Sequence, residues 1–203
     1  EQRYVRNTNV LVTRFEVGDD AWEQFDFMPY IQDGLSHRRP PRIVRYLRPL
    51  RGAPRLSMDL DIQPDYARMD SEPRTTERGL EFKGHGGMAI TLHSNVPAPY
   101  LASGRPFRLD RGRYFVLDCG SSEPYMHMDE IERDLDLTIA SWRRWTQSCS
   151  LPGFSDEAVL RSALCLKLHQ YGETGAIIAA STTSIPEVVG EPRTWDYRFC
   201  WLR

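Results

Sequence analysis

The sequence predicts an antiparallel β-sandwich that is followed by helices. Three observations lead to this fold class. Short segments that alternate apolar and polar residues recur up to residue 118, and Gly, Pro, Asp and Ser separate them. The character of the chain changes between Cys119 and Pro124, and apolar residues then recur at helical spacing. Short strands at regular spacing favour two packed antiparallel sheets.

The first two strands are predicted at Asn9–Val17 and Ala21–Met28. Both are rich in β-branched and aromatic residues, and Gly18-Asp19-Asp20 between them is a hairpin signal. The basic, proline-broken segment Ser36–Pro41 is interpreted as a solvated loop. The remaining strands are expected at Arg42–Leu50, Arg55–Ile62, Gly79–Lys83, Met88–His93, Arg105–Leu109 and Arg113–Asp118.

Two helices are predicted after the strands. The first runs from Met126 to Thr146, has acidic residues at its start, and places its apolar side chains on one stripe: Ile131, Leu135, Ile139, Trp142 and Trp145. The second begins at Ser155, a predicted N-cap, and ends by Gly172. Its apolar residues cover nearly every side, so we expect it to be buried against neighbours on more than one face.

The composition argues against two classes of partner, nucleic acid and membrane. The chain has 203 residues, 40% of them hydrophobic, which is enough for a sizeable core. Its net charge of -2 provides no basic field, so nucleic acid is not expected as a partner. No apolar run reaches the roughly 18 to 20 residues that cross a bilayer, so no membrane is expected either. The N-terminus does not resemble a signal peptide, but Glu1 is not an initiator methionine, and the localisation stays open.

Cysteine and histidine spacing predicts neither a metal site nor a cofactor. The cysteines lie too far apart for a CxxC site or a short disulfide framework: Cys119, Cys149, Cys165 and Cys200. We interpret them as reduced and buried, which favours a cytoplasmic protein. No two histidines share one helix face at metal-ligand spacing.

The last stretch of the chain has an unusual composition. A run of small and β-branched residues from Gly175 closes on Pro186, which excludes one long helix. Aromatic and charged residues then alternate: Trp195, Asp196, Tyr197, Arg198, Phe199, Trp201 and Arg203. Flat apolar rings beside charged groups are typical of a site for a sugar, which has an apolar face and a rim of hydroxyls. The alternative is that the segment is core, with the tips of Arg198 and Arg203 in water.

This segment, from Gly175 to Arg203, resembles the signature of glycoside hydrolase family 15, the glucoamylase and trehalase family, in its bacterial form. The resemblance implies that Arg203 is similar to the arginine that holds the hydroxyls of the non-reducing glucose. It also implies substrate-binding roles for Trp201 and Tyr197, with possible support from Trp195 and Asp196. A salt-bridged structural carboxylate is the simplest role for Asp196, because arginines flank it.

The resemblance also implies a domain layout. Residues 1–122 would be the later part of a supersandwich-like β domain, residues 123–154 a helical linker, and residues 155–203 the first helix and sugar-binding loop of a truncated (α/α)6 barrel. The chain would then be an N-terminal fragment of a larger protein, and the rest of the barrel would be its partner.

The implied activity is hydrolysis of α-glucosides, either oligosaccharides or disaccharides, from the non-reducing end with inversion. Inversion requires two carboxyl groups roughly 6.5 to 9.5 Å apart. In the family both catalytic glutamates lie beyond the position of Arg203, so no catalytic residue is expected in this chain. The main hypothesis is a glucoamylase-like enzyme for α-1,4 or α-1,6 links, and the alternative is an α,α-trehalase. A non-catalytic carbohydrate-binding or regulatory β-sandwich module is the alternative from another class.

Overall fold

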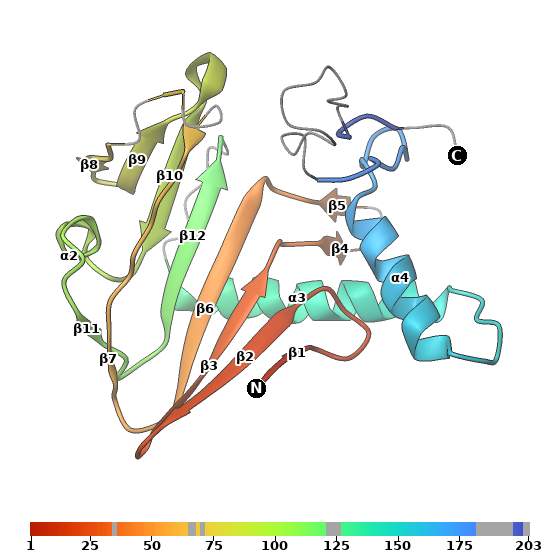
Figure 1. The fold of residues 1–203 in the computed structure, drawn as a ribbon, viewed down its shortest axis with the longest axis horizontal. Coiled ribbons are helices and arrows are strands. Elements are labelled where there is room, and N and C mark those ends of the chain that lie inside the picture. Colours follow the sequence, from red (N-terminus) through yellow and green to blue (C-terminus); the bar gives the residue numbers. More distant parts are fainter. Residues whose placement is uncertain (34–35, 65–67, 70–71, 121–126, 182–196, 201–203) are drawn as a thin grey trace, which may run out of the picture. The chain divides into compact units, whose positions relative to one another are not determined.

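The computed structural model describes residues 1–33, 36–64, 68–69, 72–120, 127–181 and 197–200 (Figure 1). The chain divides into two compact units, residues 1–144 and residues 145–203. The first unit holds all the described strands, and the second contains the last helix. This order, antiparallel strands and then helices, confirms the coarse layout that the sequence predicts.

The described strands of the first unit form an eight-stranded antiparallel sheet in the order β1-β2-β3-β6-β12-β10-β9-β8 (Figure 1). Its strands are β1 (Gln2–Tyr4), β2 (Leu11–Val17), β3 (Asp20–Phe27), β6 (Arg42–Arg51), β8 (Arg74–Thr76), β9 (Gly79–Lys83), β10 (Ala89–Ser94) and β12 (Arg113–Cys119). The predicted hairpin joins β2 to β3, with Val17 paired to Asp20 and Gly18 in the left-handed region at φ +58°. A short 3-10 turn, η1 (His85–Gly87), joins β9 to β10.

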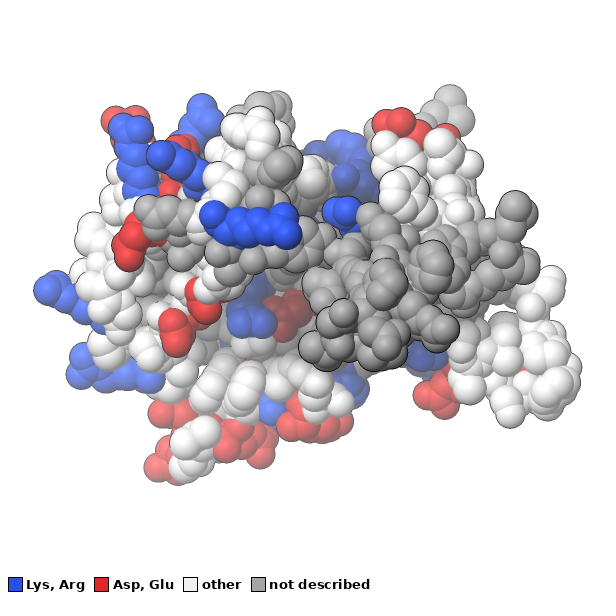
Figure 2. Space-filling view, turned by 45° about the horizontal axis from the view of Figure 1, so that its top comes forward, with Lys and Arg blue, Asp and Glu red and all other residues white. Residues whose placement is uncertain are grey.

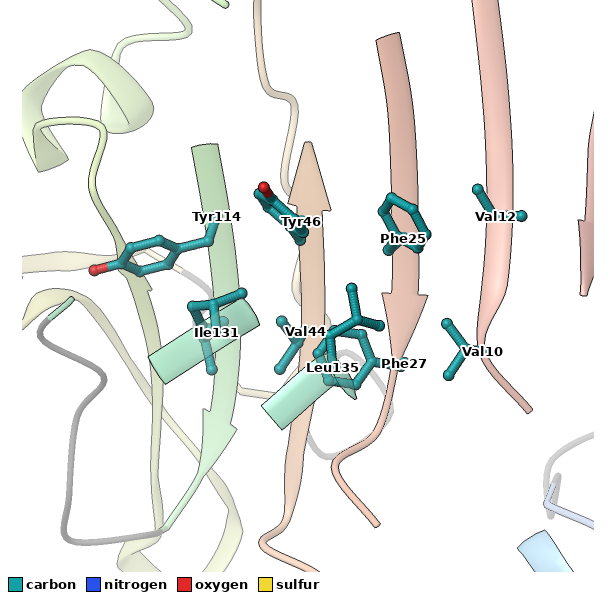
Figure 3. Packing of buried hydrophobic residues seen from close by; sticks show 10 residues of the cluster. Val10, Val12, Phe25, Phe27, Val44, Tyr46, Tyr114, Ile131 and Leu135 are labelled. Atoms are coloured by element: carbon teal, nitrogen blue, oxygen red, sulfur yellow. The ribbon is translucent and has the colours of Figure 1, made fainter. Parts of the chain in front are cut away.

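One face of the sheet packs against helix α3 (Met128–Gln147). Successive residues of a strand point to opposite faces, so alternate residues of β3, β6 and β12 share this side. Figure 3 shows Leu135 of α3 over Val44 and Phe27 of the sheet, and Ile131 over the neighbouring strand β12. The predicted stripe on the helix is therefore confirmed, and Ile131 has no exposed surface.

The opposite face has a different cover. Its core contains Trp22, Leu47, Leu92 and Phe115 of the sheet. Over them lie helix α2 (Ala98–Ala102) and a two-stranded ribbon of β7 (Arg55–Leu56) and β11 (Phe107–Arg108).

The second layer is smaller than the sequence predicts. We expect two packed sheets, whereas the described residues give one large sheet and short ribbons. The predicted strand Arg55–Ile62 is a strand only at residues 55–56, because no described segment pairs with the rest. The predicted strand Arg105–Leu109 likewise shortens to Phe107–Arg108.

A second ribbon consists of β4 (Ile31–Asp33) and β5 (Ser36–Arg38). It attaches to α3 through buried hydroxyl groups of the helix. The backbone N–H of Tyr30 donates to Thr138 Oγ1 at 3.2 Å, and that of Gln32 donates to Ser141 Oγ at 2.9 Å. The predicted loop at Ser36–Pro41 therefore begins as a strand.

The second unit contains helix α4 (Asp156–Leu168). Its start differs from the prediction, because Ser155 adopts a left-handed conformation at φ +51° and its side chain makes no capping hydrogen bond. Asp156 instead accepts a hydrogen bond from the N–H of Gly153 at 2.9 Å. The expectation that the helix is buried is wrong for this chain, since Leu164 is its one buried residue and Leu166 and Leu168 are exposed.

The described surface carries both signs of charge, and Figure 2 shows Asp and Glu side chains among the Lys and Arg side chains in view. None of the helices in the described ranges combines the length and the apolar character that a membrane span requires. All four cysteines are free. Cys119 and Cys149 are half-buried, but Cys165 and Cys200 are exposed, so the prediction of four buried thiols is wrong for those two.

Candidate functional site

The candidate site lies in the segment that follows α4, and it begins with a short hairpin. The chain reverses after Tyr171, and Gln170 then bridges Ile177 in antiparallel orientation. The N–H of Tyr171 donates to the carbonyl of Ala176 at 2.7 Å, and the N–H of Ile178 donates to that of His169 at 3.3 Å. The end of α4 therefore fixes the position of residues 176–178.

Side chains of α4 stabilise this turn. Lys167 Nζ donates to Gln170 Oε1 at 2.5 Å, and Gln170 Nε2 donates to the carbonyl of Gly175 at 3.0 Å. Lys167 also lies 5.8 Å from the ring centroid of Trp145. Gly175 has φ +77°, a conformation that favours glycine. These roles of Lys167 and Gln170 are not predicted from the sequence, although their spacing at the end of a helix is a usable signal.

The two described ends of the family-like segment lie side by side. The N–H of Ala179 donates to the carbonyl of Phe199 at 3.1 Å, and that of Ala180 donates to the carbonyl of Tyr197 at 2.9 Å. Residues 197–199 lie in a turn that these bonds place next to residues 179–180, and we call residues 179–180 and 197–199 together the strip. Backbone hydrogen bonds hold the aromatic end of the segment in a defined position.

Tyr197 is the one predicted binding residue within the described part of the chain. It is half-buried, and the backbone bond to Ala180 fixes its place. Phe199, two residues further on, is 66% exposed. The core interpretation of this segment is therefore wrong for Phe199. Trp195, Asp196, Trp201 and Arg203 lie outside the described residues.

Tyr197 brings the chemistry of a phenol to the strip. A phenol offers a flat apolar ring together with a hydroxyl that both donates and accepts hydrogen bonds. Among the described residues, no group of three or more His, Cys, Asp or Glu side chains is placed to hold a metal ion. A phenol side chain can contact both an apolar face and a hydroxyl group of a ligand.

Comparison with known proteins gives a family match for this part of the chain. Residues 153–203 match the sequence profile described as glycosyl hydrolases family 15. The whole chain aligns with proteins named trehalase. It is 28% identical over 208 residues to one from Thermoplasma acidophilum, 30% over 218 residues to one from Thermoplasma volcanium, and 30% over 225 residues to one from Mycobacterium tuberculosis. These alignments cover 36%, 33% and 32% of the three relatives. No solved structure matches the chain significantly.

The matching region contains the whole candidate site, from the turn before α4 to Arg203, and the sheet unit aligns with the same relatives. Residues 153–203 therefore belong to the part of the chain that matches glycosyl hydrolases family 15. The whole chain is similar to proteins named trehalase from two Thermoplasma species and a mycobacterium, and it spans about a third of their length.

Proposed function

We propose that this chain is part of a glycoside hydrolase whose substrate is α,α-trehalose. The observation that carries the proposal is the alignment of the complete chain, sheet unit included, with proteins named trehalase. The family profile alone covers only residues 153–203 and supports any activity of the family. The relatives therefore favour the trehalase hypothesis over the glucoamylase-like one that led the sequence analysis.

In this proposal the segment after α4 binds one glucose unit. Arg203 donates charge-assisted hydrogen bonds to the sugar hydroxyls, while Tyr197 and Trp201 provide apolar surface, with Trp195 and Asp196 beside them. The half-buried Tyr197 and the exposed Phe199 support a role at a surface rather than in a core. The strip is held by α4, so it can position the sugar without reorganising.

The bond-breaking groups lie outside this chain. An inverting mechanism needs one carboxylic acid to protonate the glycosidic oxygen and one carboxylate to activate water on the other side of the ring. We place both on the part of the protein that the relatives have beyond these residues. That part is also the partner that completes the substrate pocket.

The test is a comparison of substrates with the protein at its natural length. Trehalose, maltose and isomaltose are assayed separately, and kcat/KM is measured for each. We expect trehalose to be preferred by roughly a hundredfold or more, since a site built to hydrogen-bond one substrate rejects an analogue that leaves its polar groups unpaired.

Each other outcome contradicts the proposal in its own way. A preference for maltose or isomaltose would support the glucoamylase-like hypothesis instead. Sugar binding without hydrolysis of any of the three would support the non-catalytic carbohydrate-binding module.

A further inference from the structure

Gln170 follows the C-cap residue of α4, and it contacts the turn of residues 171–176 in two ways. Its backbone pairs with Ile177 in an antiparallel bridge. Its side-chain Nε2 donates to the carbonyl of Gly175 at 3.0 Å. The side chain of Gln170 therefore ties the closing end of the turn to the end of the helix.

Lys167 determines which way the amide of Gln170 points. The two residues are three positions apart, so their side chains lie on one side of the helix end. Lys167 Nζ donates to Gln170 Oε1 at 2.5 Å, and an ammonium group has donors but no acceptor. The amide oxygen must therefore face Lys167, which leaves the Nε2 end to face the carbonyl of Gly175.

The side chain of Lys167 is itself held in place. It is half-buried, and its Nζ lies 5.8 Å from the centroid of the Trp145 ring, within the range of a cation–π contact. Trp145 is half-buried as well. Direct contacts therefore run from Trp145 to Lys167, then to Gln170, and from there to Gly175.

The turn leads directly into the strip. Residues 176–178 follow Gly175, and the backbone N–H groups of residues 179–180 then donate to the carbonyls of Phe199 and Tyr197. An extended chain rises about 3.3 Å per residue, so little slack separates the Gly175 carbonyl from the strip. A shift of Gly175 therefore displaces the strip, and Tyr197 with it.

We propose that Gln170, oriented by Lys167, is a positioning residue for the sugar, a role that rests on the proposed function of the strip. Its amide keeps the turn in the conformation that places Tyr197 against the sugar. Gln170 acts through the turn and not through contact with the substrate. A strip that is already in place binds the sugar without first paying for its own ordering.

Gln170→Glu separates this role from simple stabilisation of the helix end. The carboxylate accepts a hydrogen bond from Lys167 as the amide does, but it cannot donate to the carbonyl of Gly175. If Gln170 only stabilises the end of α4, the variant keeps the affinity of the wild type for the sugar. If Gln170 positions the strip, the variant loses affinity although the contact with Lys167 remains.

The experiment measures trehalose hydrolysis by the natural-length protein. We expect KM to rise by roughly three- to tenfold in Gln170→Glu and in Gln170→Met. Loss of one net hydrogen bond lowers the fraction of protein whose turn is correctly placed by about that factor, and the apparent affinity falls with this fraction. A smaller amount of folded protein would instead lower the maximal rate and leave KM unchanged.

Glu173→Gln is the matched control, since Glu173 is exposed in the same turn and its side chain makes no hydrogen bond to a described residue. We expect the KM of this control to equal that of the wild type. A wild-type KM in Gln170→Glu, or a rise of the same size in Glu173→Gln, would overturn the proposal.

Two variants of Lys167 test its orienting role. Without the ammonium group, in Lys167→Met, the amide of Gln170 can turn its oxygen towards the Gly175 carbonyl, so we expect KM to rise as in Gln170→Glu. Lys167→Arg keeps a charged donor, and its KM should stay within about twofold of the wild type. Equal KM values in the two variants would contradict the orienting role.

Hydrogen exchange at the amides of Ala179 and Ala180 separates this proposal from the proposed function. We expect both amides to exchange faster in Gln170→Glu than in Glu173→Gln, because their bonds to the strip loosen when the turn shifts. A wild type that does not hydrolyse trehalose would count against the proposed function, and faster exchange in Gln170→Glu would still support the positioning role. Equal exchange in the two variants would overturn that role whatever the substrate.

Discussion

Arg42 and Asp118 form a buried ion pair between β6 and β12. Their side chains are almost completely buried, in contrast to the guanidinium of Arg48, whose ion pair with Glu23 lies at the surface. Removing one partner of a buried pair leaves an uncompensated charge in a medium of low dielectric constant. Removing one partner therefore changes the free energy of unfolding more than the intact pair contributes to it.

We expect Asp118→Asn to lower the free energy of unfolding by about 3 to 5 kcal/mol. The double variant Arg42→Met with Asp118→Leu should recover most of that loss, because it removes both charges. The free energy of unfolding of the wild type, the single variant and the double variant is measured by denaturant unfolding. Glu23→Gln is the control, with an expected cost of about 1 kcal/mol or less. A loss in Asp118→Asn that is no larger than in this control would contradict the assignment.

His93 is a buried histidine on β10, with 6% of its surface exposed. Its Nδ1 lies 2.6 Å from the carbonyl oxygen of Arg78, so Nδ1 carries the proton and donates it. Burial lowers the pKa of His93 below its ordinary value, and the hydrogen bond to Arg78 and the charge of Asp118 oppose that shift only in part. Arg42 and Arg78 add to the lowering of this pKa.

This lowered pKa predicts a pH dependence of stability. Above about pH 6.5 the imidazole is neutral in both the folded and the unfolded protein. Below that pH the unfolded protein binds a proton that the folded protein does not, so stability falls as the pH drops towards the folded pKa. We expect the unfolding free energy of His93→Gln to fall less steeply between pH 6.5 and 5. Parallel pH profiles for the two proteins would contradict this.

Arg203 is the residue on which the proposed sugar site depends most. Loss of a hydrogen bond from a charged group costs about 1.5 to 3 kcal/mol, so Arg203→Ala should lower kcat/KM for trehalose by roughly 10- to 150-fold. The comparison variant is Arg133→Ala, since Arg133 is exposed on α3. Unchanged kinetics in Arg203→Ala, with the Arg133→Ala value equal to wild type, would refute the role of Arg203.

At the scale of elements, α3 organises one side of the first unit. It covers the sheet with its apolar stripe, and it anchors the β4–β5 ribbon with Thr138 and Ser141. Both hydroxyl residues are buried, at 0% and 1% exposure. A backbone N–H that loses such a partner inside the protein remains desolvated and unpaired.

Ser141→Ala should therefore destabilise the protein by about 1 to 3 kcal/mol and accelerate hydrogen exchange at the amide of Gln32. Ser162→Ala is the matched control, because Ser162 lies on the exposed surface of α4 and bonds only to Ala158 of its own helix. The control should change stability by no more than about 0.5 kcal/mol. Slow exchange at Gln32 in Ser141→Ala would show that the hydroxyl is not its partner.

The sequence predicts the long elements well because the apolar residues of each recur at the spacing of a strand or of a helix. β2, β3, β6, β9 and β12 begin and end within two residues of the predicted bounds, and so do the ends of α3. In each case alternation or a three-to-four spacing is sustained over many residues. The apolar face of each element then determines which side is buried.

The short elements depend on tertiary contacts that no local pattern shows. β4 and β5 have three residues each. The hydroxyl groups of α3 that position β4 lie about a hundred residues later in the sequence. The segment from Met58 to Ile62 continues the local pattern of a strand but has no described neighbour to pair with. Periodicity predicts which residues face a core, whereas pairing depends on the rest of the fold.

The sequence predicts which segment forms the candidate site, but it does not predict how the residues of that segment are arranged. The aromatic and charged residues from Trp195 to Arg203 are contiguous, and their composition fits a sugar site as well as a core, so the resemblance to family 15 is what favours the sugar site. The contact of Ala179 and Ala180 with Phe199 and Tyr197 joins residues on two sides of a long connection. Such a contact follows only from the folded chain, as do the supporting roles of Lys167 and Gln170.

At the scale of the whole molecule, two compact units supply different parts of one proposed enzyme. The first provides a large sheet that packs on α3, and the second presents the strip that we propose binds the sugar. Both units align with proteins named trehalase. The central claim is that the protein hydrolyses trehalose with inversion.

The anomers of the released glucose test that claim most directly. Trehalose joins two α-glucose units, so inversion at one anomeric carbon releases one β-glucose and one α-glucose, whereas retention would release α-glucose alone. Proton NMR during the first minutes of trehalose hydrolysis by the natural-length protein, before the anomers equilibrate, measures the ratio. We predict equal amounts of α- and β-glucose. Initial release of α-glucose alone, or no hydrolysis of trehalose, would contradict the claim.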